Sequence, residues 1–594
     1  MKRFNLLFDP WIPVIRSNQN EPNHIAAYEI VKKDILSLDA PRADFNAALT
    51  QFLIGLLQTV FAPENPRAWR NLFNQPPSED DLIKRFEDIK DAFYLNGDGY
   101  RFMQDALSIK TGKLRPIEEM IFGAPGISGK DKNQDHFVKR NDIDGLCYSC
   151  VAMGLLTANL FAEDGGSGYF QSMRGNGFVS CLVQSTTYQS VKSLWINLWL
   201  NVLENNIKST IDSKQNFYWM KDLPEKPYAE RLERTEIEIN DLKIKNKAAK
   251  NETHKNEIDE KIRQLEIESD GIKKEIDSLG DNKIVYPESG SLQAYWAWMR
   301  RFYLDMKNTM NGKCSVCHRN DELVANFYKV SKGYKYPKEE WQNIHPFSPS
   351  MKYHRDQYTK ENLKYKDKML ALEMTENGLP YTYWQDFLTQ TDKQAPAKTV
   401  TRHLKEKRSD EQLIIWSFGY AMESNSPRGW YESKTPLYLF ENEGQREPFE
   451  IEVGKYVQAA NRIADNRSGY LVYAIKSAWY DENKDKNKVQ KKSFNNDKAS
   501  EIARCFWENT ESKFYELMEL LYCHINKNML TDEKKAELRQ CWYEYIKRET
   551  KKLFDRWAFV DGIQNNPQRI AKAYNKLMGN LNSKSLKKEI LALP

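Results

Sequence analysis

The chain has 594 residues, of which 40% are hydrophobic and 29% are charged. This length exceeds what one ordinary core organises, so we expect at least two domains. Apolar runs such as "FLIGLLQTVFA" at 52–62 fall short of the roughly 20 residues of a membrane span, and the N-terminus lacks the pattern of a signal peptide. Eight cysteines are too few for a disulfide scaffold. We therefore expect a cytoplasmic protein, and its net charge of +5 permits nucleic-acid binding without demanding it.

The first ~435 residues mix short strand-like runs, loops and helices. "NLLFDPWIPVI" predicts an extended segment broken by prolines, whereas the apolar spacing of 43–62 predicts a helix that ends at Pro63. "YRFMQD" and "FVSCLVQSTTY" are typical of further short elements around a core. We predict a large mixed α/β N-terminal domain over residues 1–437.

Residues 226–280 differ from the rest of this domain because they are rich in Glu, Lys and Ile and nearly free of glycine and aromatics. A heptad runs through the second half of the segment, from Ile258 to Leu279, and a weaker one through the first half. This pattern predicts an inserted antiparallel helical hairpin, similar to a coiled coil. A docking arm and a solvated insertion without a partner both fit it.

From residue 450 to 594 the chain is predicted to be mostly helical, with segments near 452–482, 495–528, 531–557 and 564–592. The connections between the later segments are short, which favours antiparallel neighbours. We predict a C-terminal four-helix bundle and an α+β protein overall.

Two CxxC pairs, Cys147 with Cys150 and Cys314 with Cys317, have the spacing of zinc ligands. Four thiolates would hold a closed, structural Zn²⁺ that joins two distant strips of one domain. Two unrelated CxxC turns are the alternative interpretation. His318 is expected to face solvent, because four thiolates already complete a tetrahedral site.

A zinc-dependent nuclease of the His-Asn-His type is the main catalytic alternative, since His345 and His354 follow the second CxxC pair. Such an enzyme needs an open metal position beside an acid or base. The sequence has no HExxH, and Asp135-His136 precedes the first cysteine pair instead.

Two polar regions are candidate nucleic-acid contacts. The glycine-dense segment 163–177 is not a P-loop, but its backbone N–H groups could approach a phosphate or a groove edge, with Arg174 supplying charge. The segment 329–338 interleaves lysines with aromatics, as nucleic-acid surfaces do. An ordinary flexible loop and an ordinary soluble surface are the respective alternatives.

Several motifs occur in one order along the chain: "FNLLFDPWIPV", "FMQ", "CYSC", "KCSVC", "HPFSP" at 345–349 and "FGYAME…RGWYES". Together they resemble the large subunit of the type I-E CRISPR Cascade surveillance complex. The resemblance covers nearly the whole chain except the 226–280 hairpin. It implies a non-enzymatic, antiviral-defence protein that binds guide RNA and other Cascade subunits. Such a subunit recognises the protospacer-adjacent motif (PAM) in double-stranded target DNA, helps to open the duplex and recruits a helicase-nuclease.

The resemblance also implies positions for the DNA-reading residues. The glycine loop that contacts the motif's minor groove matches Gly165, Gly166, Ser167 and Gly168. Ser167 departs from the family's glycine at or next to this position, although a backbone N–H could still make the contact. The groove-facing lysine matches Lys332, with Lys329 and Lys335 as rivals.

Two further loops are matched in the same way. The strand-separating wedge corresponds to Glu423, Ser424 and Asn425, where a glutamate would be repelled by phosphate. The loop before the first CxxC pair, which touches the guide RNA, corresponds to Phe137 and Val138, with Phe137 as the stacking residue.

Overall fold

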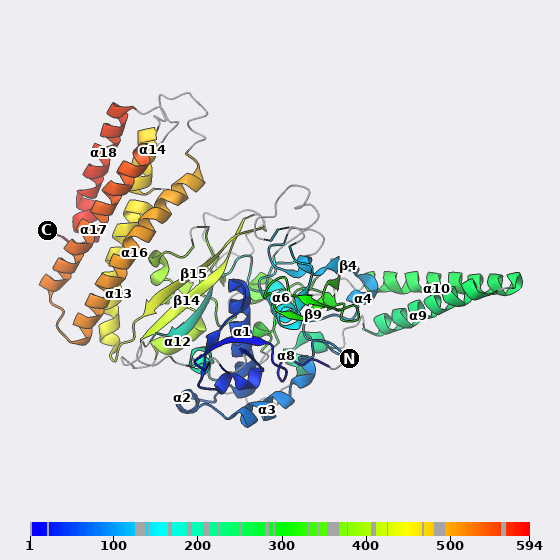
Figure 1. Cartoon of the computed structure of the whole chain (residues 1–594). Helices are drawn as coiled ribbons and strands as arrows, with labels where there is room; N and C mark the ends of the chain where they lie inside the picture. Colours follow the sequence, from blue (N-terminus) through cyan, green and yellow to red (C-terminus); the bar gives the residue numbers. More distant parts are fainter. Residues whose placement is uncertain are drawn as a thin grey trace. The chain divides into compact units, whose positions relative to one another are not determined.

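The computed structural model describes residues 3–593, except 19, 21–22, 125–137, 140–141, 164–168, 187–192, 206–212, 222–225, 250, 279–283, 289–291, 331–332, 342–343, 353–367, 377, 406–411, 424–425, 466–467, 480–493 and 560–565. Its elements form a mixed α+β protein with a helical C-terminal region (Figure 1). Two compact units are present: 1–179 with 188–373 and 419–430, and 180–187 with 374–418 and 431–594. In the described part of the chain, no helix is long and apolar enough to cross a membrane.

The first unit is centred on α1 (Ala43–Phe61), which packs against α6 (Tyr148–Leu160) and α7 (Leu194–Trp199). Nearly every residue of α1 is buried, so this helix is central rather than amphipathic. A cluster of aromatic rings surrounds Phe52, which makes edge-on contacts with Trp11, Phe93, Phe102 and Trp296 at centroid distances of 5.6–5.9 Å. These contacts place the main hydrophobic core of the first unit around α1.

Short antiparallel sheets surround this core. The order of the first is β2-β1-β3, that of the second is β4-β10-β7 and that of the third is β5-β9-β8, and β11 pairs with β12. The strands are β1 (Ile12–Arg16), β2 (His24–Ile25), β3 (Ile35–Leu38), β4 (Lys113–Pro116), β5 (Leu146–Cys147), β7 (Phe302–Leu304), β8 (Met310–Lys313), β9 (Asn320–Val324), β10 (Asn326–Lys329), β11 (Ser350–Lys352) and β12 (Met369–Ala371). The remaining α-helices are α2 (Pro66–Asn74), α3 (Glu79–Glu87), α4 (Ser108–Thr111), α8 (Ser213–Asn216) and α11 (Lys338–Trp341), with 3-10 turns at 27–31, 90–92, 117–120, 218–220 and 293–295.

Helices α9 (Lys226–Ala248) and α10 (Glu252–Ser278) lie side by side as a hairpin (Figure 1). Ile239, Ile258 and Ile262 form its central hydrophobic contact. At its base, Leu232 packs with Leu107 of the α4 region. Ion pairs flank the apolar seam on both sides, which is the charge pattern of a two-stranded coiled coil: Arg231–Glu268, Lys243–Glu266, Lys261–Glu238 and Lys273–Glu236.

The second unit combines a three-stranded sheet with the C-terminal helices. The order of the sheet is β15-β14-β6, and β14 (Leu413–Glu423) and β15 (Ser426–Leu437) continue into residues that group with the first unit. The other elements are β6 (Ser180–Ser185), a 3-10 turn at Tyr381–Trp384, β13 (Gln394–Ala395), α12 (Lys398–Leu404), α13 (Glu443–Ala464), α14 (Tyr470–Trp479), α16 (Asn496–Asn526), α17 (Asp532–Ala558), α18 (Pro567–Leu581) and a π-helical turn at Ser585–Ile590. The C-terminal helices pack mainly as α13 with α16 and α17, α14 with α17 and α18, and α16 with α17.

Buried polar contacts give these helices a defined register. Glu452 of α13 is 5% exposed and accepts hydrogen bonds from both Nε and Nη2 of Arg539 on α17. Trp542 donates a hydrogen bond from Nε1 to the carbonyl of Tyr456 at 3.0 Å. A charged pair at this depth is retained only where its hydrogen bonds are complete, so it favours one alignment of α13 on α17.

One predicted helix is wrong. The sequence predicts one continuous helix over 452–482, but α13 ends at Ala464 and α14 begins at Tyr470. Asp465 causes the break, because its carboxylate accepts hydrogen bonds from the backbone N–H and the hydroxyl of Ser468. Its carbonyl also accepts from Gly469 N–H at 2.8 Å. Aspartate, serine and glycine together favour a turn over a helix.

Candidate nucleic-acid interface and metal centre

The first cysteine pair lies where β5 leads into α6. Cys147 occupies the N-cap position of α6 and Cys150 lies in its first turn. The sequence after Cys147 is apolar and contains no proline, which allows a buried helix to begin directly at the end of the strand. Thiolates at this end of a helix are stabilised by the helix dipole.

The second cysteine pair forms the turn of the β8–β9 hairpin. Cys314 N–H donates to the carbonyl of Arg319 at 2.8 Å, and His318 N–H donates to the carbonyl of Cys314 at 3.0 Å. His318 closes this turn with φ of +62°, and its side chain is exposed, as the sequence predicted. The turn therefore presents two thiols on one side of a short β-hairpin.

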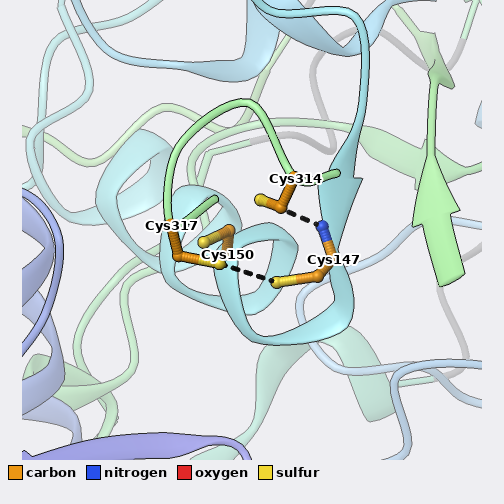
Figure 2. Close-up of side chains that lie close together, drawn as sticks. All are labelled: Cys147, Cys150, Cys314 and Cys317. Carbon is orange, nitrogen blue, oxygen red and sulfur yellow. Dashed lines mark hydrogen bonds between the residues drawn. The ribbon is translucent and has the colours of Figure 1, made fainter. Parts of the chain in front are cut away.

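Strand pairing joins the two cysteine segments. Cys147 of β5 pairs with Leu323 of β9, in the sheet that also contains β8. Next to them, Ser315 N–H donates to the carbonyl of Gly145 at 3.0 Å. Figure 2 shows the result, four cysteine side chains from two distant parts of the chain gathered around one point.

The spacing of the sulfur atoms fits a metal ion. All four Sγ atoms lie within 4.8 Å of one another, and those of Cys147 and Cys317 are 3.6 Å apart. A tetrahedral Zn²⁺ with Zn–S bonds of about 2.3 Å needs sulfurs roughly 3.8 Å apart. Cys147 N–H also donates to the sulfur of Cys314 at 3.4 Å, a contact that favours a thiolate (Figure 2). Three of the cysteines are buried and Cys317 is half-buried, so the cluster could hold a metal ion.

When no cation is bound, the four thiols change one another's pKa values. The hydrogen bond with Cys147 lowers the pKa of Cys314, while the contact with Cys147 raises the pKa of Cys150. These opposite directions mean that one thiolate suppresses ionisation of its neighbours. A divalent cation would remove this conflict by stabilising all four thiolates.

One arginine side chain donates hydrogen bonds to Glu163 and Phe170, which lie on either side of the glycine segment 164–168. Arg300 is 5% exposed. Its guanidinium donates to the carbonyl of Phe170 at 2.9 Å and to the carbonyl of Glu163. Its backbone N–H donates to Oδ1 of Asn159 on α6 at 2.8 Å, which fixes the arginine on that helix. Arg300 therefore fixes Glu163 and Phe170, one on each side of the glycine segment, relative to α6.

A second cation lies near Tyr169, the residue that follows the glycine segment. Lys329 Nζ is 4.7 Å from the centroid of the Tyr169 ring, and the Arg300 guanidinium lies 5.1 Å from it. Burial lowers the pKa of Lys329. Two cations therefore lie within about 5 Å of the Tyr169 ring centroid, at the residue that follows the glycine segment. No spacing rule in the sequence links Arg300 to residues 163–170, and the sequence prediction missed it.

The structure contradicts the prediction that Arg174 supplies charge to a phosphate. Arg174 is fully buried, where its Nε donates to Ser348 Oγ and its Nη1 donates to Gln51 Oε1, both at 2.8 Å. Its guanidinium also lies 3.8 Å from the Phe178 ring centroid. These contacts hold the Arg174 side chain inside the core of the first unit, away from any phosphate on the surface.

The remaining predicted residues are placed in part. Glu423 is exposed at the end of β14 and forms an ion pair with Arg428. Val138 is 5% exposed and therefore buried, and Lys335 is exposed. The other residues lie outside the described part of the chain: Phe137, Gly165, Gly166, Ser167, Gly168, Lys332, Ser424 and Asn425.

His345, one candidate of the nuclease alternative, is 2% exposed. Its ring lies against Tyr295 and Phe347, and its Nδ1 accepts a hydrogen bond from Phe347 N–H at 3.2 Å. Among the described residues, the metal-binding cluster contains cysteines alone. His354 lies outside them.

A sequence model of the family "CRISPR-associated protein Cse1" matches residues 5–243 and 273–553. The chain belongs to this family. The predicted resemblance to the large subunit of type I-E Cascade is thereby confirmed. Residues 244–272, which include most of α10, lie between the two matched stretches. A comparison with curated proteins gives no match.

Solved structures share the fold. Thermus thermophilus CasA has a TM-score of 0.65 and 13% identity over 98% of this chain and 99% of its own. Thermobifida fusca Cse1 has a TM-score of 0.59 and 14% identity over 99% and 98%. A chain of a CRISPR RNA-guided surveillance complex has a TM-score of 0.59 and 12% identity over 98% and 100%. At these identities the similarity establishes the fold.

Proposed function

We propose that this chain is the DNA-binding large subunit of an RNA-guided type I-E Cascade complex, without catalytic activity of its own. In this role it binds guide RNA and other Cascade subunits, recognises the PAM in double-stranded target DNA, helps to open the duplex and recruits a helicase-nuclease. The observation that carries the proposal is the surroundings of the glycine segment, where Arg300 donates to Glu163 and Phe170 on either side of it and Lys329 lies near Tyr169. Family membership supports it independently.

The glycine segment is the proposed motif reader. Gly165, Gly166, Ser167 and Gly168 would offer backbone N–H groups to the minor groove, with Lys332 as the accompanying cation. Minor-groove patterns are degenerate, so a few backbone and lysine contacts would give relaxed motif recognition. Of the rival lysines, Lys335 is exposed, whereas Lys329 is occupied against Tyr169.

The β14–β15 turn is the proposed wedge, formed by Glu423, Ser424 and Asn425. The ion pair with Arg428 offsets the negative charge of Glu423, which reduces its repulsion from phosphate. Opening a duplex costs about 1.4 kcal/mol per base-pair step, and pairing with guide RNA then offsets this cost. A wedge therefore needs to separate only the first steps.

The four cysteines are the proposed ligands of a structural Zn²⁺. When bound, the ion supplies a closed tetrahedral crosslink rather than a reactive centre, because four protein ligands leave no open position. Cys147 and Cys150 follow the proposed guide-RNA contacts Phe137 and Val138, and Cys314 and Cys317 precede the lysine segment. Joining the two pairs would align the RNA-contacting and DNA-reading segments.

We propose domains at 1–437, with the hairpin at 226–280, and at 450–594. In this interpretation the C-terminal helices form a four-helix bundle in which α13 and α14 together make one broken helix. Cytoplasmic localisation follows from the proposed role, since guide RNA and invading DNA meet there.

Reconstitution with guide RNA, the other Cascade subunits and motif-varied duplexes tests the proposal. We expect target binding that needs this chain and depends on the motif. Binding that needs the chain but ignores the motif would refute motif reading. Divalent-metal-dependent cleavage of DNA by the purified chain would support the nuclease alternative.

A further inference from the structure

Two stretches of the C-terminal helical region have an unbalanced charge. Residues 453–479 contain four basic residues and one acidic residue, Asp465, and residues 562–588 contain six basic residues and no acidic one. The whole chain has 88 basic and 83 acidic residues, so this imbalance is local. The described parts of these stretches include the end of α13, all of α14 and all of α18, and α14 packs against α18 (Figure 1). Two segments that are distant in the sequence thus bring positive charge to one pair of neighbouring helices.

Arg569 joins the beginning of α18 to the end of α14. Its guanidinium donates hydrogen bonds to the carbonyl of Ala478 at 2.9 Å and to that of Trp479 at 2.6 Å. A cation at this end of α14 also complements the helix dipole. Further along α18, Lys576 contacts Tyr473, which lies earlier in α14, so the two helices run antiparallel. The charge of Arg569 is therefore used to hold the helices together.

The surface beside this junction combines tyrosine rings with cations. Tyr473 is 48% exposed, and Lys576 Nζ lies 4.4 Å from its ring centroid. Tyr470 accepts a hydrogen bond at its hydroxyl from Nε of the exposed Arg462, at 3.0 Å. Residues three or four apart share one face of a helix, which places Tyr470 with Tyr473 and the exposed Lys572 with Lys576. We call these five residues the α14–α18 face.

The two lysines of this face differ from those of neighbouring helices. Five lysines of α16 and α17 pair with a carboxylate three residues away: Lys498–Glu501, Lys513–Glu516, Lys534–Glu537, Lys535–Asp532 and Lys552–Glu549. Among the described residues, neither Lys572 nor Lys576 has such a carboxylate partner. Asp465, the acidic residue between α13 and α14, already accepts hydrogen bonds from the backbone N–H and the hydroxyl of Ser468. The positive charge of Lys572 and Lys576 is therefore not neutralised by an ion pair in this part of the protein.

We propose that the α14–α18 face binds single-stranded DNA, with phosphates on Lys572 and Lys576 and a base stacked on Tyr473. Lysines attract the phosphate backbone without reading its sequence, and an aromatic side chain can stack on any base. An exposed ring favours a single strand over a duplex, because the bases of a duplex already stack on one another. On the proposed function, on which this last step rests, the ligand is the strand that is displaced when guide RNA pairs with the target.

Fluorescence anisotropy of a labelled oligothymidine of about 15 nucleotides tests the face with the full-length chain. Each lysine contact to a single-stranded phosphate contributes about 0.7 to the slope of log K against log salt concentration. Replacing both lysines, by Lys572→Gln with Lys576→Gln, should therefore lower this slope by about 1.4 and raise the Kd about 25-fold at about 0.1 M salt. Tyr473→Ala should raise the Kd about fivefold to a hundredfold without changing the slope, whereas Tyr473→Phe should keep the original Kd.

The matched control is Lys534→Gln with Lys535→Gln, which removes the same charge from two ion-paired lysines of α17. The Kd and salt slope of this control should equal those of the original chain. If the variant that lacks Lys572 and Lys576 has the same values as this control, the proposal is wrong. Equal binding of strand and duplex, together with no effect of Tyr473→Ala, would also overturn single-strand recognition by the face.

The reconstituted guide complex separates this proposal from motif reading. The variant that lacks Lys572 and Lys576 should keep the ratio of Kd values for duplexes that differ in the motif, while the displaced strand becomes more accessible to a single-strand nuclease. A complex without motif preference, whose large subunit still binds oligothymidine through this face, would contradict motif reading and support the face. Loss of this variant from the complex, with unchanged oligothymidine affinity, would identify the face as a protein interface and overturn the proposal.

Discussion

Replacing Arg300 with alanine should weaken motif-dependent DNA binding while the complex still assembles. Arg300 donates to the carbonyls of Glu163 and Phe170, on either side of the glycine segment. Hydrogen bonds that involve a charged group contribute about 1.5–3 kcal/mol each, so the two together contribute about 3 kcal/mol or more to holding this segment. If losing these two hydrogen bonds reduces the free energy of DNA binding by half of that amount, the Kd for a motif-bearing duplex rises about tenfold.

Fluorescence anisotropy of a labelled duplex, with the reconstituted complex, measures this effect. Arg300→Lys keeps the positive charge but lacks the fork that reaches both carbonyls, so we expect an intermediate Kd. Arg85→Ala, an exposed change on α3, is the control. A correctly assembled Arg300→Ala complex with the affinity and motif preference of this control would refute the idea that Arg300 positions the reader.

Three further outcomes test the structure. Cys314→Ser should abolish binding of one zinc per chain, measured by elemental analysis, and lower the melting temperature by about 5 °C or more, whereas Cys541→Ser at an exposed free thiol should change neither. Arg539→Ala should reduce the free energy of unfolding in urea by about 1.5–3 kcal/mol, because the buried carboxylate of Glu452 loses both hydrogen bonds from Arg539 and keeps the one from Lys455. The same change at Arg548, which is 58% exposed, should cost less than about 1 kcal/mol. Burial lowers the pKa of His24 to about 4 from 6.5, so its contribution to stability is present above pH 6.5 and is lost as the pH falls towards 4. Replacing His24 with Gln should flatten the pH dependence of the melting temperature in that window, and an unchanged profile would contradict this assignment.

The cysteine cluster could be predicted from sequence because its chemistry depends on residue type and spacing. Two CxxC pairs are uncommon outside metal sites, and four thiols satisfy one tetrahedral ion without further information. Arg300 could not be predicted in this way. Its role depends on a fold that brings it beside Glu163, which is 137 residues away in the sequence, and arginines occur throughout the chain.

Helix prediction succeeded where periodicity dominates and failed where local side-chain chemistry competes with it. The segment 531–557 has a clear apolar stripe and forms α17. The segment 452–482 has comparable apolar spacing, but Asp465 and Gly469 form a turn within it. Arg174 shows the corresponding limit for sites: a cation in a glycine-rich segment suggests phosphate binding, yet tertiary contacts bury it against Gln51 and Ser348.

The most direct test of the account is the ratio of Kd values for two duplexes that differ only in the motif. It is measured with the reconstituted guide complex in the presence and absence of this chain, at one fixed salt concentration. We predict a motif-dependent ratio that falls to about one when the chain is omitted. A ratio that stays the same without the chain would show that another subunit reads the motif.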